Sequence, residues 1–79
     1  MEHDLEVDAR GLLCPLPVLR LARALRSAPP ATVAILLATD PAAAEDVAIF
    51  CRERGHELLS EERDGEVLKF RVAKTVSAG

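Results

Sequence analysis

The sequence predicts a two-layer α/β sandwich with the element order β-α-β-α-β-β. Short segments with apolar residues at every second position, or in a continuous run, are typical of strands, whereas two longer segments repeat apolar residues with a helical period. An Asp-Gly pair near the C-terminus lies between two alternating segments and predicts a hairpin. The 79 residues support a single domain, whose ordered core we expect at about residues 4–74.

The N-terminal part predicts a strand and a helix. Residues 4–8 (DLEVD) alternate between acidic and apolar residues, as expected of a short strand at the edge of a sheet. Residues 15–28 have the helical period, and Pro29-Pro30 ends this helix. The helix is predicted to have an apolar face of Val18, Leu21, Ala22, Leu25 and Ala28 and an opposite face of Arg20, Arg23, Arg26 and Ser27.

The middle of the chain predicts a second strand and a second helix. Residues 32–39 (TVAILLAT) form a nearly continuous apolar run with β-branched residues, which favours a central strand. Asp40 is expected to be the N-cap of the next helix, with Pro41 at its first position and Gly55 at its C-terminal end. The core face predicted for this helix consists of Ala43, Ala44, Val47, Phe50 and Cys51.

The C-terminal part predicts a hairpin. Two strands, at residues 57–62 and 66–73, flank the turn Arg63-Asp64-Gly65. In the second strand, apolar and basic residues alternate, so one face is expected in the core. Residues 74–79 show no pattern, and we expect this tail to fray.

The connections between these elements predict which segments meet. Because crossovers between parallel strands are right-handed, both helices are expected on one face of the sheet. Their N-termini then lie at the same end, which places Cys14 beside Asp40. The other face of the sheet stays open, and Leu36 and Val67 are expected to point from it as a candidate contact surface.

Composition disfavours several classes of function. The net charge of −3, the pI near 5.3 and the absence of Trp and Tyr disfavour nucleic-acid binding, which relies on basic fields and aromatic stacking. No apolar run approaches the ~20 residues of a membrane span. The N-terminal residues lack the apolar segment of a secretion signal, so we expect a cytoplasmic protein. Cys14, Cys51, His3 and His56 do not have the spacing of a metal site, and none is expected.

The segment RGLLCPLPVLRLA, residues 10–22, carries the most specific chemical signal. Pro15 is expected at the first helical position and Pro17 at the third, where backbone N–H groups have no helical partner. Cys14 is then the N-cap, and the positive end of the helix is expected to lower the pKa of its thiol and make it nucleophilic. In the alternative interpretation, Cys14 is a small apolar residue packed beside the helix.

Other residues are expected to assist or surround this thiol. We count Gly11 among the residues that support the turn and Arg10 as a source of nearby positive charge. Arg20 and Arg23 are candidates for docking a partner protein, although a solvated helix face is the simpler interpretation of the arginine stripe that they form with Arg26. Asp40 is a candidate for orienting the active end, beside its predicted role as a cap.

A single reactive thiol suits group transfer better than disulfide cycling. The third residue after Cys14 is Pro17, so there is no Cys-x-x-Cys dithiol. Cys51 lies roughly 15 Å along the second helix and is expected in the core. Neither histidine is close to Cys14 in the sequence, which disfavours a Cys-His hydrolase. A redox sensor that cycles through sulfenic acid is a further interpretation.

Four segments carry a resemblance to a known family. They are GLLCPLPVL at 11–19, TDPAAAEDVAIFC at 39–51, GHELL at 55–59 and DGEVLKFRVAK at 64–74. In this order and spacing, they resemble the TusA/SirA-like sulfur-carrier family, from Leu5 to Lys74.

The resemblance implies a fold and a function. The fold is a mixed four-stranded sheet of order 1-2-4-3, with strand 4 antiparallel to the others. The function is that of a carrier whose motif cysteine, here Cys14 supported by Pro15 and Pro17, accepts sulfane sulfur as a persulfide. The donor would be a cysteine desulfurase or a rhodanese-like protein, and an acceptor sulfurtransferase would take the sulfur for tRNA thiolation, molybdenum cofactor or sulfur oxidation. No separate cofactor is implied, because the sulfur is bound covalently.

The motif departs from the common family pattern, and another function class stays open. Family members commonly have Glu between the two prolines and a basic residue before the cysteine, whereas this chain has Leu16 and Leu13. The alternative to a carrier is a noncatalytic RNA- or protein-binding module, suggested by the arginine stripe and by fold analogy. As a carrier, the protein is expected to be a monomer that binds neither nucleic acid nor membranes directly.

Overall fold

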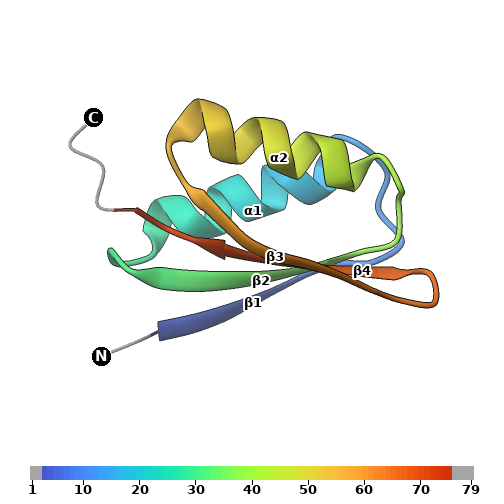
Figure 1. Ribbon diagram of the computed structural model, residues 1–79, viewed down its shortest axis with the longest axis horizontal. Coiled ribbons are helices and arrows are strands. Elements are labelled where there is room, and N and C mark those ends of the chain that lie inside the picture. The colour runs from blue at the N-terminus through green and yellow to red at the C-terminus, as the bar shows by residue number, and fades with distance from the viewer. Residues whose placement is uncertain (1–2, 76–79) are drawn as a thin grey trace.

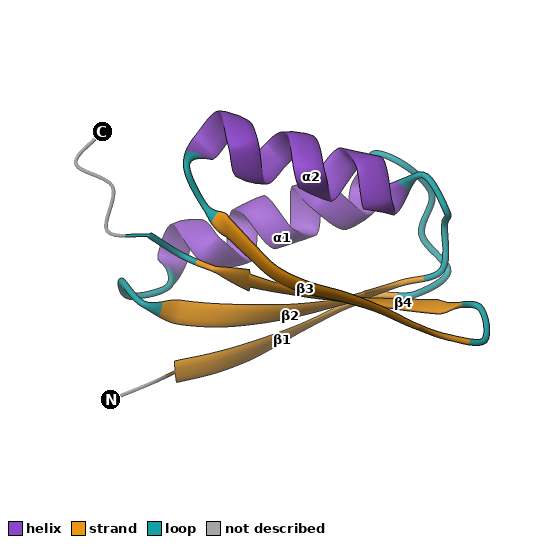
Figure 2. Cartoon of the chain, viewed as in Figure 1, coloured by secondary structure: helices purple, strands orange, loops and turns teal. Residues whose placement is uncertain are grey.

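The computed structural model describes residues 3–75 and contains six elements in the predicted order (Figure 1). They are β1 (His3–Ala9), α1 (Leu16–Ser27), β2 (Thr32–Ala38), α2 (Ala43–Arg54), β3 (Glu57–Asp64) and β4 (Val67–Ala73). Both helices cover the same face of the sheet, and its other face is open (Figure 2). The two-layer sandwich is therefore confirmed. Neither of these helices has the length and apolar character needed to cross a membrane.

The sheet has the order β1-β2-β4-β3 that the resemblance implied. β1 and β2 are parallel, whereas β4 is antiparallel to both of its neighbours, β2 and β3. β1 therefore lies at an edge, as predicted. Three exposed acidic residues of β1 pair in register with β2 residues of the open face: Asp4, Glu6 and Asp8.

The core lies between the sheet and the helices. Phe70 of β4 is fully buried in the centre of the sheet, and its register neighbour on β2, Leu36, is also fully buried. Burying a side chain of this size contributes about 1.5–3 kcal/mol of transfer free energy. The buried apolar residues of the core are Ala9, Leu21, Leu25, Ala34, Leu36, Ala38, Ala43, Val47, Cys51, Leu68, Phe70 and Val72.

The burial of Leu36 contradicts the prediction that it points from the open face. The open face of β2 instead carries Val33, Ile35 and Leu37, which are half-buried. Because side chains alternate along a strand, an offset of one residue exchanges the two faces. The run TVAILLAT contains no polar residue in its interior that would fix this phase. Val67 is partly exposed and lies beside Leu37 in a surface hollow.

Both helices begin later than predicted. Pro15 is the N-cap of α1 and Ala42 that of α2, and neither cap is closed by a side-chain hydrogen bond. The predicted N-cap roles of Cys14 and Asp40 are therefore wrong. The end of α2 is as predicted, since Gly55 adopts the left-handed conformation, with φ of 76°, that a residue with a side chain rarely adopts.

Lys74 contradicts the expectation that the tail frays from this position. Its backbone N–H donates to the carbonyl oxygen of Thr32 at 2.8 Å. Its ammonium group donates to the carbonyl oxygens of Leu25 and Ala28, both at 2.6 Å. Lys74 therefore joins the end of β4 to the C-terminal end of α1. The rest of the predicted tail, residues 76–79, lies outside the described residues.

Candidate functional site

The loops that precede the two helices meet at one end of the molecule, as predicted (Figure 2). The backbone N–H of Gly11 donates to Oγ1 of Thr39 at 2.9 Å, and the N–H of Cys14 donates to Oδ2 of Asp40 at 2.7 Å. Gly11 has a φ of 82°, which favours glycine at this turn. Gly11 and Asp40 therefore hold the segment before α1 against the segment before α2.

Cys14 lies in this turn with an exposed side chain. The N–H of Leu16 donates to the carbonyl oxygen of Leu13 at 2.9 Å and closes the turn around the cysteine. The first helical hydrogen bond runs from Leu19 N–H to the Pro15 carbonyl at 3.1 Å, which explains why the helix begins one residue later than predicted. Pro17 is buried beneath the turn, whereas Pro15 is exposed. The two prolines thus bracket the first helical residue, and Pro17 anchors the turn in the protein.

The side chain nearest to the thiol belongs to Asp46 in the first turn of α2. Sγ of Cys14 donates a hydrogen bond to Oδ2 of Asp46, with 2.6 Å between the two atoms. This hydrogen bond raises the pKa of Cys14, and partial desolvation and the negative charges of Asp46 and Asp40 act in the same direction. The predicted lowering of this pKa is therefore wrong, because Asp46 and Asp40 both favour the protonated thiol.

Arg10 does not supply positive charge to Cys14 as expected. Its Nε and Nη2 donate to the two carboxylate oxygens of Asp8, both at 2.9 Å. This two-point contact is the main reason why the pKa of Asp8 is lowered to about 2. The positive charge of Arg10 is thus neutralised by Asp8 at the end of β1.

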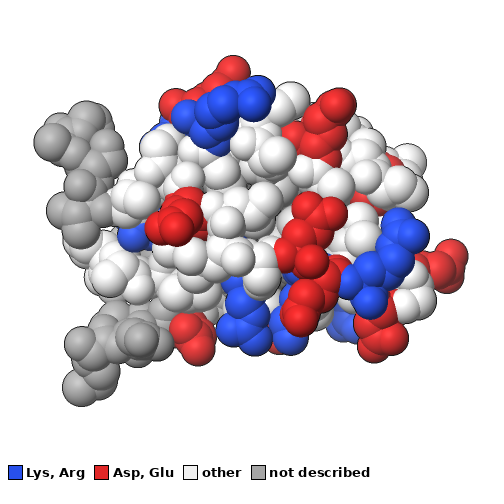
Figure 3. Space-filling view, in the orientation of Figure 1, with Lys and Arg blue, Asp and Glu red and all other residues white. Residues whose placement is uncertain are grey.

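The arginine stripe is divided between two surfaces. Arg20 and Arg23 line a hollow against β1, and Nη1 of Arg20 donates to the carbonyl oxygen of Asp8 at 3.3 Å. Arg26 lines a different hollow at the C-terminal end of α1. On the face drawn in Figure 3, basic and acidic side chains are interspersed. The three arginines are exposed as predicted, but they do not form one surface that leads to Cys14.

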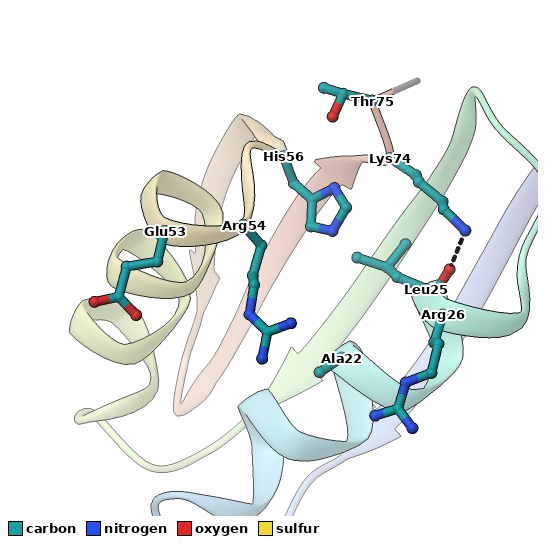
Figure 4. Close-up of a pocket in the computed structure, with 8 residues that line it drawn as sticks. All are labelled: Ala22, Leu25, Arg26, Glu53, Arg54, His56, Lys74 and Thr75. Carbon is teal, nitrogen blue, oxygen red and sulfur yellow. Dashed lines mark hydrogen bonds between the residues drawn. The ribbon is translucent and has the colours of Figure 1, made fainter. Parts of the chain in front are cut away.

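The hollow beside Arg26 lies at the C-terminal ends of both helices, whereas Cys14 precedes the N-terminus of α1. Figure 4 shows the residues that line this hollow. Figure 4 shows the His56 ring between the side chains of Arg54 and Lys74. Nδ1 of His56 is buried without a hydrogen-bond partner, and burial, followed by the charges of Lys74 and Arg54, lowers the pKa of His56. Basic groups are favourable at helix C-termini, so this cluster stabilises the two helices. His56 is therefore remote from the thiol, as predicted.

Three leucines close to Cys14 in the sequence are exposed. Leu13 is 71% exposed, Leu19 55% and Leu16 47%, which is unusual for large apolar side chains so close in the sequence. We call these three residues the leucine collar. Because its residues lie in the turn that contains Cys14 and in the first part of α1, the collar offers apolar contact area to a molecule that reaches Cys14.

Cys51 differs from Cys14 in its burial. It is 4% exposed and belongs to the core, and burial raises the pKa of its thiol. Its predicted role as a packed core residue is confirmed. Within residues 3–75, no group of three His, Cys, Asp or Glu side chains is arranged to hold a metal ion.

Comparisons with known proteins identify the family. A family model described as "Sulfurtransferase TusA" matches residues 5–74. The chain belongs to this family. A sulfur carrier protein TusA of Allochromatium vinosum is 35% identical over 74 residues, which cover 94% of this chain and 97% of that protein. A sulfur carrier protein TusA of Pseudomonas syringae pv. tomato is 37% identical over 71 residues, which cover 90% of this chain and 84% of that protein.

A solved structure confirms the fold independently. A SirA-like protein from Desulfitobacterium hafniense superposes with a TM-score of 0.77 over 95% of this chain and 99% of that chain. The sequence identity is 22%, so this likeness shows the fold alone.

Sequence reasoning missed Asp46 and Thr39 as members of the site. Glu45 and Asp46 both lie in the first turn of α2, where acidic residues are favourable whatever their function. Only the position of α2 relative to α1 determines which of the two carboxylates reaches the thiol. The sequence therefore contained no signal that separated Asp46 from Glu45.

Proposed function

We propose that the protein is a sulfur carrier that accepts a sulfane sulfur as a persulfide on Cys14 and passes it to an acceptor protein. The observation that carries the proposal is the exposed Cys14 thiol, held in the turn before α1 of a chain that belongs to the TusA family. The relatives named sulfur carrier proteins match nearly the whole chain, which supports the same role here.

The proposed cycle has a loading step and an unloading step. In loading, the sulfur of Cys14 attacks the outer sulfur of the donor persulfide, and the donor cysteine leaves as a thiolate. In unloading, an acceptor thiolate attacks the outer sulfur on Cys14, the sulfur–sulfur bond to Cys14 breaks, and Cys14 leaves as a thiolate that takes up a proton from solvent. Neither step needs an oxidant or a separate cofactor, because the sulfane sulfur moves between thiols without a net redox change.

We propose that the partners are a cysteine desulfurase or rhodanese-like donor and an acceptor sulfurtransferase, in the cytoplasm. The leucine collar would contact both partners in turn, since each must bring a sulfur atom to Cys14. Leu13 and Leu16 take the places of a basic and an acidic residue in the common family pattern, so the partners are expected to present apolar surface there. The destination of the sulfur, whether tRNA, molybdenum cofactor or sulfur oxidation, depends on the acceptor.

The raised pKa of Cys14 disfavours the sulfenic-acid sensor, although it does not by itself support the carrier. Redox-sensing cysteines are accessible thiols of low pKa, because the thiolate is the form that oxidants attack. The pKa of Cys14 is shifted in the opposite direction by Asp46. A protonated thiol resists oxidation between transfers, which is useful to a carrier.

Intact-mass spectrometry tests the proposal. The reduced protein is incubated with cysteine, a cysteine desulfurase and pyridoxal phosphate, and then with dithiothreitol. We expect a reducible gain of one sulfur atom in the wild type and in a Cys51→Ala variant, and no gain in Cys14→Ser. A sulfur adduct that persists in Cys14→Ser would exclude Cys14 as the carrier residue.

A further inference from the structure

The contact between Cys14 and Asp46 joins two side chains that are 32 positions apart in the sequence. The Cys14 backbone is held on one side by Asp40, through its N–H at 2.7 Å. The Cys14 side chain is held on the other side by Asp46, with 2.6 Å between Sγ and Oδ2. The thiol is thus fixed from both the β2–α2 loop and α2 itself.

Asp46 is partly buried, and its hydrogen bond with Cys14 lies at the surface of the protein. The residue lines a groove between the helices whose wall is apolar at Pro15, Val18 and Ile49. The groove is also lined by two charged residues of α2, Glu53 and Arg54. The neighbouring acidic residue, Glu45, is exposed in the same helical turn and does not contact the thiol.

We propose that Asp46 positions the Cys14 thiol, keeps it protonated while no sulfur is bound, and accepts its proton when sulfur is loaded. This inference rests on the proposed function, because it assigns Asp46 a part in the loading step.

The loading step balances with Asp46 as the proton acceptor. The proton of Cys14 Sγ moves to Oδ2 of Asp46 while the Sγ electron pair forms a bond to the outer donor sulfur. The sulfur–sulfur bond of the donor breaks, and its electron pair leaves on the donor cysteine, which takes up the proton from Asp46. Asp46 ends the step as a carboxylate, ready for the next cycle.

The same carboxylate distinguishes the empty carrier from the loaded one. A thiol donates a hydrogen bond to Asp46, whereas a persulfide, which is more acidic than a thiol, exists largely as an anion near neutral pH. Asp46 and Asp40 both face this group and would repel the anion. The terminal sulfur of the loaded carrier is therefore directed away from α2 and toward the solvent, where an acceptor approaches.

The pH dependence of alkylation tests this role without any sulfur donor. The reduced protein is treated with iodoacetamide across a pH series, and peptide mass spectrometry follows the modification of Cys14. In Asp46→Asn, we expect the midpoint of the rate profile to move to lower pH and the rate near pH 7.5 to rise several-fold. Glu45→Gln is the matched control, because it removes the same charge from the same turn of α2 but leaves the contact with Sγ intact.

An unchanged midpoint in Asp46→Asn, or an equal shift in Glu45→Gln, would overturn the role of Asp46. If Asp46→Asn does not fold, the alkylation profile of the wild type still tests the proposal. A midpoint for Cys14 at or below the midpoint of free cysteine would contradict a thiol that Asp46 keeps protonated. The sulfur-loading assay is a separate readout. If the wild type shows the expected alkylation profile but accepts no sulfur, the carrier function fails and the contact with Asp46 stands.

Discussion

The two ends of the helix pair carry opposite charges, and these charges have different roles in the protein. At the N-terminal end, the acidic residues Asp40 and Asp46 hold the backbone and the thiol of Cys14. At the C-terminal end, Lys74 binds two carbonyl oxygens of α1, next to Arg54. Both arrangements match the helix dipoles. The difference is that the cations complete the fold, whereas one of the carboxylates binds a reactive side chain.

The largest expected effect on stability comes from the C-terminal end. Lys74→Met removes both hydrogen bonds from the ammonium group to the end of α1. A hydrogen bond from a charged donor contributes about 2 kcal/mol to the free energy of unfolding. We expect thermal unfolding at a clearly lower temperature and sulfur loading at the wild-type rate. Slower loading in a folded Lys74→Met protein would show that the two ends are not independent.

At the N-terminal end, Asp40→Ala is expected to reduce function more than stability. The change removes the acceptor for the N–H groups of Cys14 and Ala42, so the turn is no longer held in one position. Sulfur loading from a protein donor should slow several-fold, as measured by intact mass in samples quenched at timed intervals. The loss of stability should be smaller than that of Lys74→Met. An unaltered loading rate would show that the turn is held well enough by Gly11 and Thr39.

A substitution in the leucine collar tests whether this surface binds partner proteins without taking part in the reaction of the thiol. Leu16→Glu leaves the contacts of Cys14 intact but places a charge on the apolar surface beside it. We expect slower loading from a protein donor and unchanged reaction with a small-molecule persulfide, measured side by side by intact mass. Equal effects on both reactions would assign Leu16 to the chemistry of the thiol instead.

The smallest expected effect concerns the ion pair of Asp8 and Arg10. With Arg10 present, the pKa of Asp8 is lowered to about 2 from the ordinary value of 3.8, so the pair stabilises the fold above pH 3.8 and this contribution is lost as the pH falls toward 2. In Arg10→Ala, an NMR titration should find the pKa of Asp8 closer to its ordinary value. The pKa of Cys14 should not change, because Arg10 interacts with Asp8 and not with the thiol.

The sequence predicted the elements and their order because alternation, helical period and Asp-Gly turns are local signals. It also predicted that Cys14 meets Asp40, since the handedness of crossovers constrains where helix N-termini lie. It did not predict which face of β2 is buried, because the run that contains Leu36 is apolar on both faces.

The chemistry of the candidate site was harder to predict than its location. The sign of the pKa shift at Cys14 depends on Asp46, which approaches from another helix, whereas the sequence indicated only the helix that begins beside the cysteine. Arg10 is four residues from Cys14, but its guanidinium group pairs with Asp8 at 2.9 Å. Charges within a few residues can thus be identified from sequence, but their partners are determined by packing.

The edges of the sheet have a consequence for how the protein behaves among other proteins. An unpaired edge strand invites strand addition and aggregation unless charge or irregularity prevents it. β1 carries an acidic residue at every second position from Asp4 to Asp8, and β3 is interrupted by a bulge between Leu58 and Ser60. Both edges are therefore poor templates for a further strand. Among the described residues, the leucine collar holds three of the four large apolar side chains that are exposed, and the fourth is Leu59 of β3. A protein that must associate and separate repeatedly thus has most of this apolar contact area near Cys14 and not at the sheet edges.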